Sequence, residues 1–278
     1  MSWDNLSYKG FIIPSFNKYL VWSDLMKNEL VLSDDKIQKD NIFSLSSIQF
    51  DFHFRKEMVW SKRRFYKYLG LNNDNKILLY SASSNLHFIR EPEFVEKICE
   101  RILDGEFFGQ PNLILRIHPH DNTDRFDYLA GKYPFLHVIR PWKKNEKYYW
   151  WFEPSTDDIA LLTNCLKFAD VNISAWSTVV LDAAALDLPS VCLAFALKKN
   201  SISDNLNRRC IEFGHTKVLY GYKAVKTVYD MNELVNAVNS YIQKPSLHKK
   251  ERNLMLKGIC GEEVGNSYNK YLNLICNH

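Results

Sequence analysis

The stretch NISAWSTVVLDAAALDLPSVCLAF, residues 172–195, decides the fold. It begins with a short apolar run typical of a buried strand and continues, after Ser-Ala-Trp-Ser-Thr, with a helical pattern over 178–187. Asp-Leu-Pro then ends the helix, because proline cannot continue the helical hydrogen bonding. A second apolar run follows at 190–195. The order strand, helix, strand predicts two parallel strands joined by a crossover helix.

The same alternation continues on both sides of this stretch. Apolar runs predict strands at 76–83, 112–120, 136–142, 170–174 and 190–195, with a sixth at 216–221. Amphipathic patterns predict helices at 91–103, 123–134, 155–169 and 178–187, and three closing helices at 231–243, 246–258 and 262–276. This order indicates an α/β fold: a doubly wound, mostly parallel, Rossmann-like sheet followed by C-terminal helices.

The first sixty residues carry weaker signals. Residues 20–32 predict a short amphipathic helix, and 41–54 predict a strand followed by a turn. A helix is expected over 60–70, because Ser61 is a good N-cap and Gly70 a good stop.

Composition excludes several classes of protein. The 278 residues are 46% hydrophobic and 24% charged, with a net charge of +4, which is too small for a nucleic-acid partner without a clustered basic patch. The polar N-terminus is unlike a signal peptide, and no apolar run approaches the roughly 18 residues of a membrane span. The six cysteines form no CxxC pair. We therefore expect a cytoplasmic location, with peripheral association at the inner face of the membrane as an alternative.

Polar or basic residues follow four of the predicted strands. In an open α/β sheet, ligands bind outside the carboxyl ends of the strands, so these positions are candidate ligand-binding residues. They are Ser81 and Ser83 after the first strand, Arg116, His118 and Pro119 after the second, Arg140 after the third, and Ser174, Ser177 and Thr178 after the fourth.

The helix that follows Ser177 predicts a phosphate site. Its first backbone N–H groups and the Ser177 and Thr178 hydroxyls suit a phosphate. Asp182, four residues after Thr178, lies on the same helix face and suits ribose or sugar hydroxyls. The alternative is an ordinary serine cap with a solvent-exposed aspartate.

His118 has two interpretations of its own. Beside Arg116 and held by Pro119, it suits a phosphate or a base, and the alternative is a structural histidine. No further ligands accompany it at metal-site spacing, so we predict no metal. The chain also lacks the GxGxxG, Walker A and GxSxG motifs, which argues against hydride transfer, P-loop hydrolysis and an α/β-hydrolase.

Taken together, RIHP at 116–119 and DIALLTNCLKFADVNISAWSTVVLDAAALDLPSV at 158–191 resemble the C-terminal donor-binding half of a GT-B glycosyltransferase. The resemblance is to the capsule, lipopolysaccharide and surface-polysaccharide enzymes, including polysialyl- and Kdo-transferases and CDP-glycerol glycerophosphotransferases. In that superfamily an HP motif and a Ser/Thr motif bind the nucleotide, and they match His118-Pro119 and Ser177-Thr178. The segment IQFDFH also resembles the family's junction between halves, although Ser46 to Asp51 lack its glycine and proline.

The resemblance implies a domain division and a set of ligands. Residues 1–60 would be the interdomain junction or a remnant of an N-terminal domain, 61–260 the donor-binding domain and 261–278 a crossover helix. The donor would be a CMP-, CDP-, UDP- or GDP-linked sugar and the acceptor a glycan or a lipid-linked glycan, with no tightly bound cofactor and no nucleic acid. An N-terminal acceptor domain is an expected partner, and no catalytic residue is assigned.

The resemblance leaves the activity open between three hypotheses. The first is glycosyl or glycerophosphoryl transfer for surface-polysaccharide synthesis. The second is a nucleotide-sugar epimerase of GT-B architecture. The third is a non-catalytic donor-binding half of a split transferase.

Overall fold

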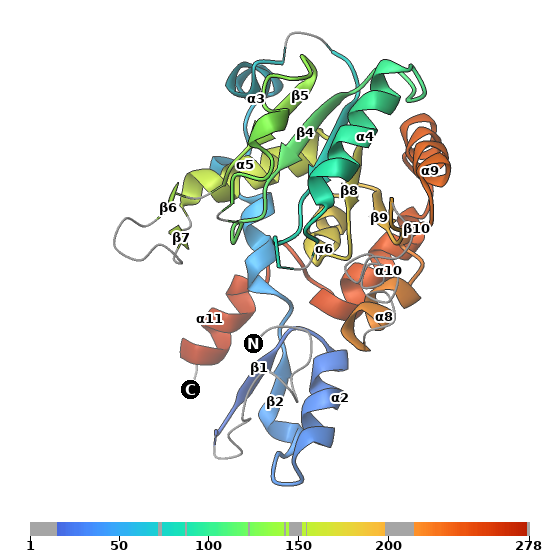
Figure 1. Cartoon of the computed structure of the whole chain (residues 1–278). Helices are drawn as coiled ribbons and strands as arrows, with labels where there is room; N and C mark the ends of the chain where they lie inside the picture. The colour runs from blue at the N-terminus through green and yellow to red at the C-terminus, as the bar shows by residue number, and fades with distance from the viewer. Residues whose placement is uncertain are drawn as a thin grey trace.

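The computed structural model describes residues 16–71, 74–86, 88–121, 123–141, 143–144, 152–153, 155–197 and 214–276. Its centre is a six-stranded, all-parallel sheet with the order β10-β9-β8-β3-β4-β5 (Figure 1). The strands are β3 (Ile77–Ser81), β4 (Asn112–Arg116), β5 (Leu136–Ile139), β8 (Val171–Ser174), β9 (Ser190–Leu193) and β10 (Val225–Val228). β3, the first of these six strands along the chain, lies in the middle of the sheet, and the direction of winding reverses between β3 and β8. This is the strand order of a doubly wound dinucleotide-binding fold.

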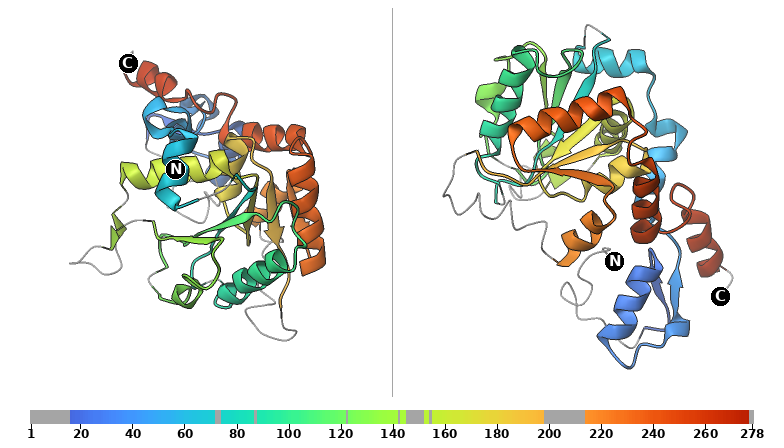
Figure 2. Two further views of the ribbon diagram at one scale, coloured as in Figure 1. Left: turned by 90° about the horizontal axis from the view of Figure 1, so that it is seen from above. Right: turned by 90° about the vertical axis from the view of Figure 1, so that its right-hand side faces the viewer.

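Helices cover both faces of the sheet (Figure 2). On one face, α4 (Glu91–Leu103) and α9 (Met231–Gln243) pack over the sheet. On the other face lie α5 (Thr156–Phe168), α6 (Val179–Ala185) and α10 (Lys249–Cys260). Successive side chains of a strand point to opposite faces, so Tyr80 packs in the first layer and Leu79 in the second. The doubly wound sheet predicted from the sequence is confirmed.

Local capping signals set the predicted helix boundaries. Helix α5 begins with a capping box, in which the Ser155 hydroxyl accepts the Asp158 N–H and the Asp158 carboxylate accepts the Ser155 N–H. Helix α3 (Lys62–Leu69) begins at Ser61, whose hydroxyl accepts the Arg64 N–H. It ends at Gly70, which adopts the left-handed conformation with a φ of 70°.

Two predicted elements are wrong. Residues 123–134 contain only a 3-10 turn, η4 (Asp127–Leu129), instead of a helix. Phe126 and Leu129 enter the core three residues apart, which matches the three-residue period of a 3-10 turn, and Gly131 then reverses the chain with a φ of 76°.

The sixth strand is also misplaced. Residues 216–221 belong to helix α8 (Gly214–Gly221), and the strand is the following Val-Lys-Thr-Val of β10. A short apolar run fits a buried helix as well as a buried strand, and β-branched residues favour the strand in β10.

A smaller unit lies below the sheet in Figure 1. Strand β1 (Tyr19–Val21) pairs in parallel with β2 (Ile42–Ser44), and α2 (Asp24–Ser33) and the 3-10 turn η1 (Lys39–Asn41) connect them. The 3-10 turns η2 (Ile48–Phe54) and η3 (Lys56–Met58) lead from this unit into the main sheet. Strands β6 (Lys143–Lys144) and β7 (Phe152–Glu153) form a short antiparallel pair.

The end of the chain returns to the smaller unit. Helix α11 (Tyr268–Cys276) follows two glycines with positive φ, Gly261 and Gly265, which shorten the predicted 262–276 helix at its start. The Tyr271 hydroxyl donates to the Ser46 carbonyl at 2.9 Å. Ser46 itself has a φ of 68°. A serine therefore holds a backbone conformation that normally favours glycine. No helix within the described ranges combines the length and apolarity needed to cross a bilayer.

Candidate functional site

Three side chains form a row across the carboxyl ends of the central strands. Ser81 at the end of β3 is in register with Arg116 on β4 and with Ser174 on β8. Residues in register on neighbouring strands point to the same face, and adjacent strands lie about 4.8 Å apart. Leu79 and Ile114, two residues earlier on β3 and β4, pack in the layer that contains α5. The row therefore lies on the α5–α6 face, at the switch point between β3 and β8.

The outer two members of this row have buried polar atoms without a hydrogen-bond partner among the described residues. These atoms are Nε of Arg116 and Oγ of Ser174, and Ser174 is completely buried. The middle member differs, because the Ser81 hydroxyl donates to Oδ1 of Asn172 at 2.8 Å and Asn172 in turn donates to Ser190. Ser81 is thus satisfied inside the sheet. Buried polar groups are normally paired, so Arg116 and Ser174 are the members suited to a ligand.

The burial of the Arg116 guanidinium is not offset by the charges near it. Burial lowers the pKa of Arg116, and smaller opposing effects come from Cys165, Asp182 and Asp158. A buried cation is stabilised by an anion that is placed against it. The guanidinium is therefore suited to an anionic ligand group such as a phosphate.

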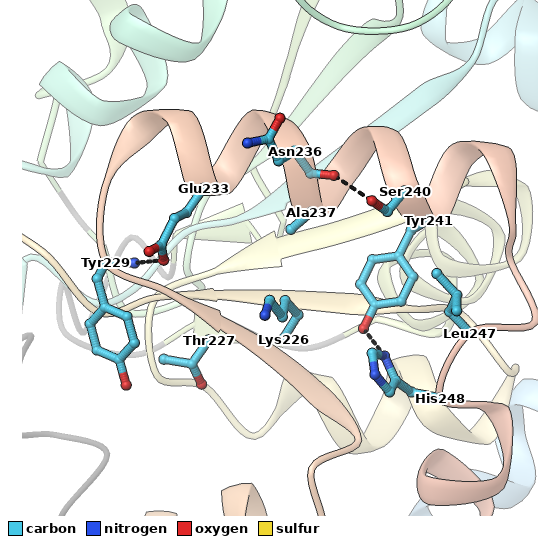
Figure 3. A pocket seen from close by; sticks show the side chains of 10 residues that line it. All are labelled: Lys226, Thr227, Tyr229, Glu233, Asn236, Ala237, Ser240, Tyr241, Leu247 and His248. Carbon is cyan, nitrogen blue, oxygen red and sulfur yellow. Dashed lines mark hydrogen bonds between the residues drawn. The ribbon is translucent and has the colours of Figure 1, made fainter.

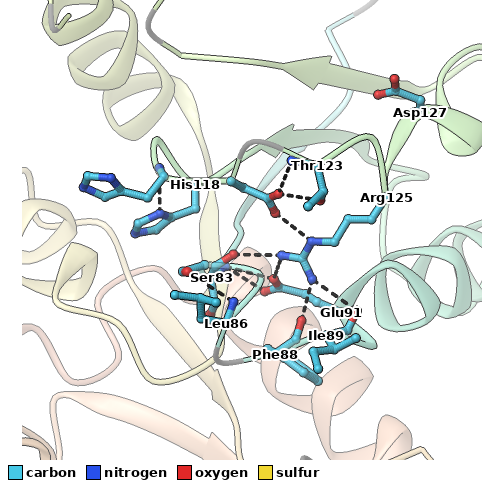
Figure 4. Close-up of polar contacts among 12 residues, drawn as sticks. Ser83, Leu86, Phe88, Ile89, Glu91, His118, Thr123, Arg125 and Asp127 are labelled. Carbon is cyan, nitrogen blue, oxygen red and sulfur yellow. Dashed lines mark hydrogen bonds and ion pairs between the residues drawn. The ribbon is translucent and has the colours of Figure 1, made fainter. Parts of the chain in front are cut away.

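The loop after β3 is held rigidly beside this row (Figure 4). The Ser83 N–H donates to both carboxylate oxygens of Glu91 at 2.9 Å. Arg125 donates to Glu91 at 3.0 Å, to the Ser83 carbonyl at 2.9 Å and to Asp121 at 2.6 Å. Glu91 is completely buried, and its burial raises its pKa from 4.5 to about 8 against the lowering effect of the Ser83 N–H and Arg125. The Ser83 hydroxyl is a third buried group without a partner in the described structure.

His118 and Pro119 lie in the loop after β4, where both are partly buried. The His120 N–H donates to Nδ1 of His118 at 3.1 Å. In the neutral ring this contact places the proton on Nε2, which makes Nε2 a hydrogen-bond donor. The arrangement suits a ligand oxygen, and the described residues contain no cluster of three or more side chains that fits a metal ion.

Arg140 is engaged elsewhere. Its guanidinium pairs with Asp127 and donates to the Thr123 carbonyl at 3.2 Å, at the end of the edge strand β5. The structure therefore does not bring Arg140 together with the row at the switch point.

Ser177 and Thr178 lie at the start of α6, but the N-cap falls on Thr178 instead of on Ser177. Thr178 is the N-cap residue and is exposed, but its backbone is already helical, with a φ of −71° and a ψ of −12°. The Ser177 hydroxyl accepts the Val179 N–H at 3.3 Å, as in a serine turn, instead of capping the helix.

Asp182 is held by His53, a residue of η2. Oδ1 of Asp182 lies 2.9 Å from Nε2 of His53, whose Nδ1 lies 2.9 Å from the Thr163 hydroxyl. His53 is buried, whereas the Asp182 side chain keeps 21% of its surface exposed. One carboxylate oxygen is thus fixed by His53, and Oδ2 has no hydrogen-bond partner among the described residues.

The sequence alone pointed to neither His53 nor the Glu91–Arg125 pair. His53 lies 129 residues from Asp182 and Arg125 lies 34 residues from Glu91. No local period or motif links such positions. The only signal near His53 is its place in the IQFDFH segment, which resembles an interdomain junction.

Comparison with known proteins supports the fold. The sequence matches no protein-family model and no curated protein. Similar solved structures include the UDP-GlcNAc 2-epimerase from Neisseria meningitidis bound to UDP-GlcNAc, with a TM-score of 0.59 and 14% identity over 94% of this chain and 62% of that one. The UDP-GlcNAc 2-epimerase from Methanocaldococcus jannaschii has a TM-score of 0.55 and 18% identity over 94% and 62%.

A third similar structure is the wall teichoic acid polymerase TagF, with a TM-score of 0.55 and 12% identity over 94% of this chain and 58% of that one. This chain therefore spans about 60% of the length of the solved structures that it matches. At these identities the likeness shows the fold. It is the doubly wound, Rossmann-like fold that the sequence predicted.

A separate cavity of about 560 Å³ lies between β10 and α9 (Figure 3). Its lining includes Lys226, Tyr229, Tyr241 and His248, and the Tyr241 hydroxyl lies 2.8 Å from Nδ1 of His248. None of the predicted site residues lines it. Because β10 is an edge strand, two strands away from the switch point, we place the candidate site at the ends of β3, β4 and β8.

Proposed function

We propose that the carboxyl ends of β3, β4 and β8 bind the phosphate groups of a nucleotide-activated donor. The observation that carries this proposal is a pair of buried atoms that have no hydrogen-bond partner among the described residues, Nε of Arg116 and Oγ of Ser174, on either side of Ser81 at the switch point. A guanidinium and a hydroxyl are the donors that a phosphate requires. Ser83, His118, Pro119, Ser177 and Thr178 would line the same site, since they lie in the loops at these strand ends.

Asp182 has a defined role in this proposal. Its carboxylate would accept hydrogen bonds from ribose or sugar hydroxyls through Oδ2, while His53 holds Oδ1. Arg116 and the donors around it would stabilise the charge that develops on a departing phosphate. The reaction that fits is glycosyl or glycerophosphoryl transfer to a surface-glycan acceptor. The GT-B fold and the similarity to TagF support this choice.

Titration calorimetry with CMP, CDP, UDP and GDP tests the binding site. Ser174→Ala should weaken the preferred nucleotide by about 10-fold or more, since hydrogen bonds to charged groups contribute about 1.5–3 kcal/mol. It should leave stability nearly unchanged, because the hydroxyl has no partner in the described structure. The matched control is Ser190→Ala, another buried serine, whose hydroxyl accepts from Asn172. It should lower stability and leave binding intact. Absence of nucleotide binding at millimolar concentration would overturn the proposal.

Epimerisation is the second candidate, because two of the similar solved structures are UDP-GlcNAc 2-epimerases. The two activities separate in one assay. A nucleotide sugar incubated with the chain and without acceptor would yield an epimer if the chain is an epimerase. Binding with neither epimer nor transfer would instead favour the donor-binding half of a split transferase.

A further inference from the structure

Positive charge is concentrated in one short segment of the chain. Residues 55–69 contain six lysines and arginines and one glutamate, a net charge of +5. The whole chain carries +4, so the rest of it has a net charge of −1. All six cationic side chains are exposed.

Helix α3 presents three of these six cations on one side. Phe65 is completely buried and stacks on Phe168 with ring centroids 4.9 Å apart, so the opposite side of the helix faces solvent. The helical period of 3.6 residues places Arg63 and Lys67 opposite Phe65, with Arg64 and the exposed Tyr68 on the adjoining flank. We call these four residues the basic face. It lies at the end of the molecule away from β1 and β2 (Figure 1).

The basic face is not neutralised by the described part of the chain. Lys62, at its border, pairs with Asp74 at 2.9 Å. No ion pair within the described residues involves Arg63, Arg64 or Lys67. Aromatic rings stiffen the surface, because the Arg64 guanidinium lies 4.3 Å from the Trp60 ring centroid and Tyr68 packs against Trp60 while remaining 61% exposed.

We propose that the basic face of α3 binds the surface of an anionic lipid bilayer. Exposed lysine and arginine side chains are attracted to anionic headgroups, and an exposed tyrosine is suited to the headgroup layer. The face is convex and about 12 Å long, given the 1.5 Å rise per residue of an eight-residue helix. A bilayer accepts such a local patch. A nucleic acid requires a basic surface that follows its backbone, and the net charge of −1 outside 55–69 does not extend one.

Sedimentation of the full chain with lipid vesicles tests the proposal. Vesicles of phosphatidylcholine mixed with phosphatidylglycerol should bind the chain, and pure phosphatidylcholine vesicles should not. Each cation contributes about fivefold to partitioning, so Arg63→Gln/Lys67→Gln should weaken binding about 25-fold. Raising ionic strength from about 0.1 M to about 1 M should also release the chain, because the Debye length falls from about 10 Å to about 3 Å.

The matched control is Lys244→Gln/Lys250→Gln, which removes the same charge from two exposed lysines, one at the C-cap of α9 and one on α10. It should retain nearly all binding. An equal loss in this control, or equal binding to uncharged vesicles, would overturn the proposal. Stronger retention on single-stranded RNA than on anionic vesicles at the same salt, lost in the Arg63→Gln/Lys67→Gln variant, would overturn it in favour of a nucleic-acid surface.

Discussion

Nε2 of His53 lies 2.9 Å from Oδ1 of Asp182, and this contact joins η2 to the candidate donor site. His53 comes from η2, before the main sheet begins, whereas Asp182 lies on α6 beside the switch point. A nucleotide that contacts Asp182 would therefore act on a residue whose position depends on η2.

The first prediction concerns this contact. His53→Ala should lower the free energy of unfolding by about 1–3 kcal/mol, because the completely buried Thr163 hydroxyl loses its partner. It should also weaken nucleotide binding, because Asp182 is no longer held. Thr163→Val is the matched control: it removes the contact to Nδ1 of His53 and leaves the contact to Asp182. Denaturation and calorimetry should show lower stability in both variants and weaker binding only in His53→Ala. Equal binding by both would contradict a positioning role for His53.

The second prediction concerns the pH dependence of stability. Burial raises the pKa of Glu91 to about 8 from 4.5, so the folded state favours the protonated carboxyl. The contribution of Glu91 to stability is complete below pH 4.5 and is lost as the pH rises through about 8. Its slope should reach about 1.4 kcal/mol per pH unit. Glu91→Gln, which stays neutral and keeps an acceptor for Ser83 and Arg125, should remove this slope from denaturation curves recorded across that range. An unchanged slope would show that another group titrates.

The third prediction concerns the attachment of α11. Asp51 accepts hydrogen bonds from the Gly265 N–H at 3.0 Å, the Ser267 hydroxyl at 2.7 Å and the Tyr268 N–H at 2.9 Å. Helix α11 has no buried residue, so these bonds carry much of its docking. Asp51→Ala should release the helix at a cost of about 1.5–3 kcal/mol, and limited proteolysis should cleave residues 266–276 more than 10-fold faster, since about 1.4 kcal/mol corresponds to a factor of ten. The control variant Asp35→Ala, changed at an exposed position, should be cleaved at the rate of the unchanged chain.

The fourth prediction concerns Gly261, where the chain passes between the two units. A Cβ at Gly261 would lie 2.4 Å from the Trp22 carbonyl oxygen and 2.6 Å from Cα of Ser46, and its φ is 97°. Because backbone atoms cannot move aside cheaply, Gly261→Ala should lower the free energy of unfolding by at least about 2 kcal/mol. Gly221→Ala is the control, because no atom lies within 4 Å of its Cβ position. Thermal denaturation should separate the two, and similar melting temperatures would argue against this packing.

Much of the fold follows from local patterns. The apolar runs of β3, β4, β5, β8 and β9 and the periods of α4, α5 and α9 are properties of a few neighbouring residues, and the Ser155 capping box and the Gly70 stop add exact ends to two helices. The predictions were wrong where one sequence pattern fits two different local structures. Residues 216–221 suit a buried strand and a buried helix equally, and 123–134 became a 3-10 turn because its apolar residues enter the core three positions apart.

The candidate site divides in the same way. The sequence by itself determined which residues lie at the strand ends, because the carboxyl ends of parallel strands share one edge of a sheet. Only the tertiary structure decided what each side chain does there. Ser81 bonds within the sheet, Arg140 pairs with Asp127, and Asp182 is held by His53. Arg116 and Ser174, in contrast, keep buried atoms that no other described residue pairs. These differences depend on contacts between residues far apart along the chain, and such contacts leave no local period in the sequence.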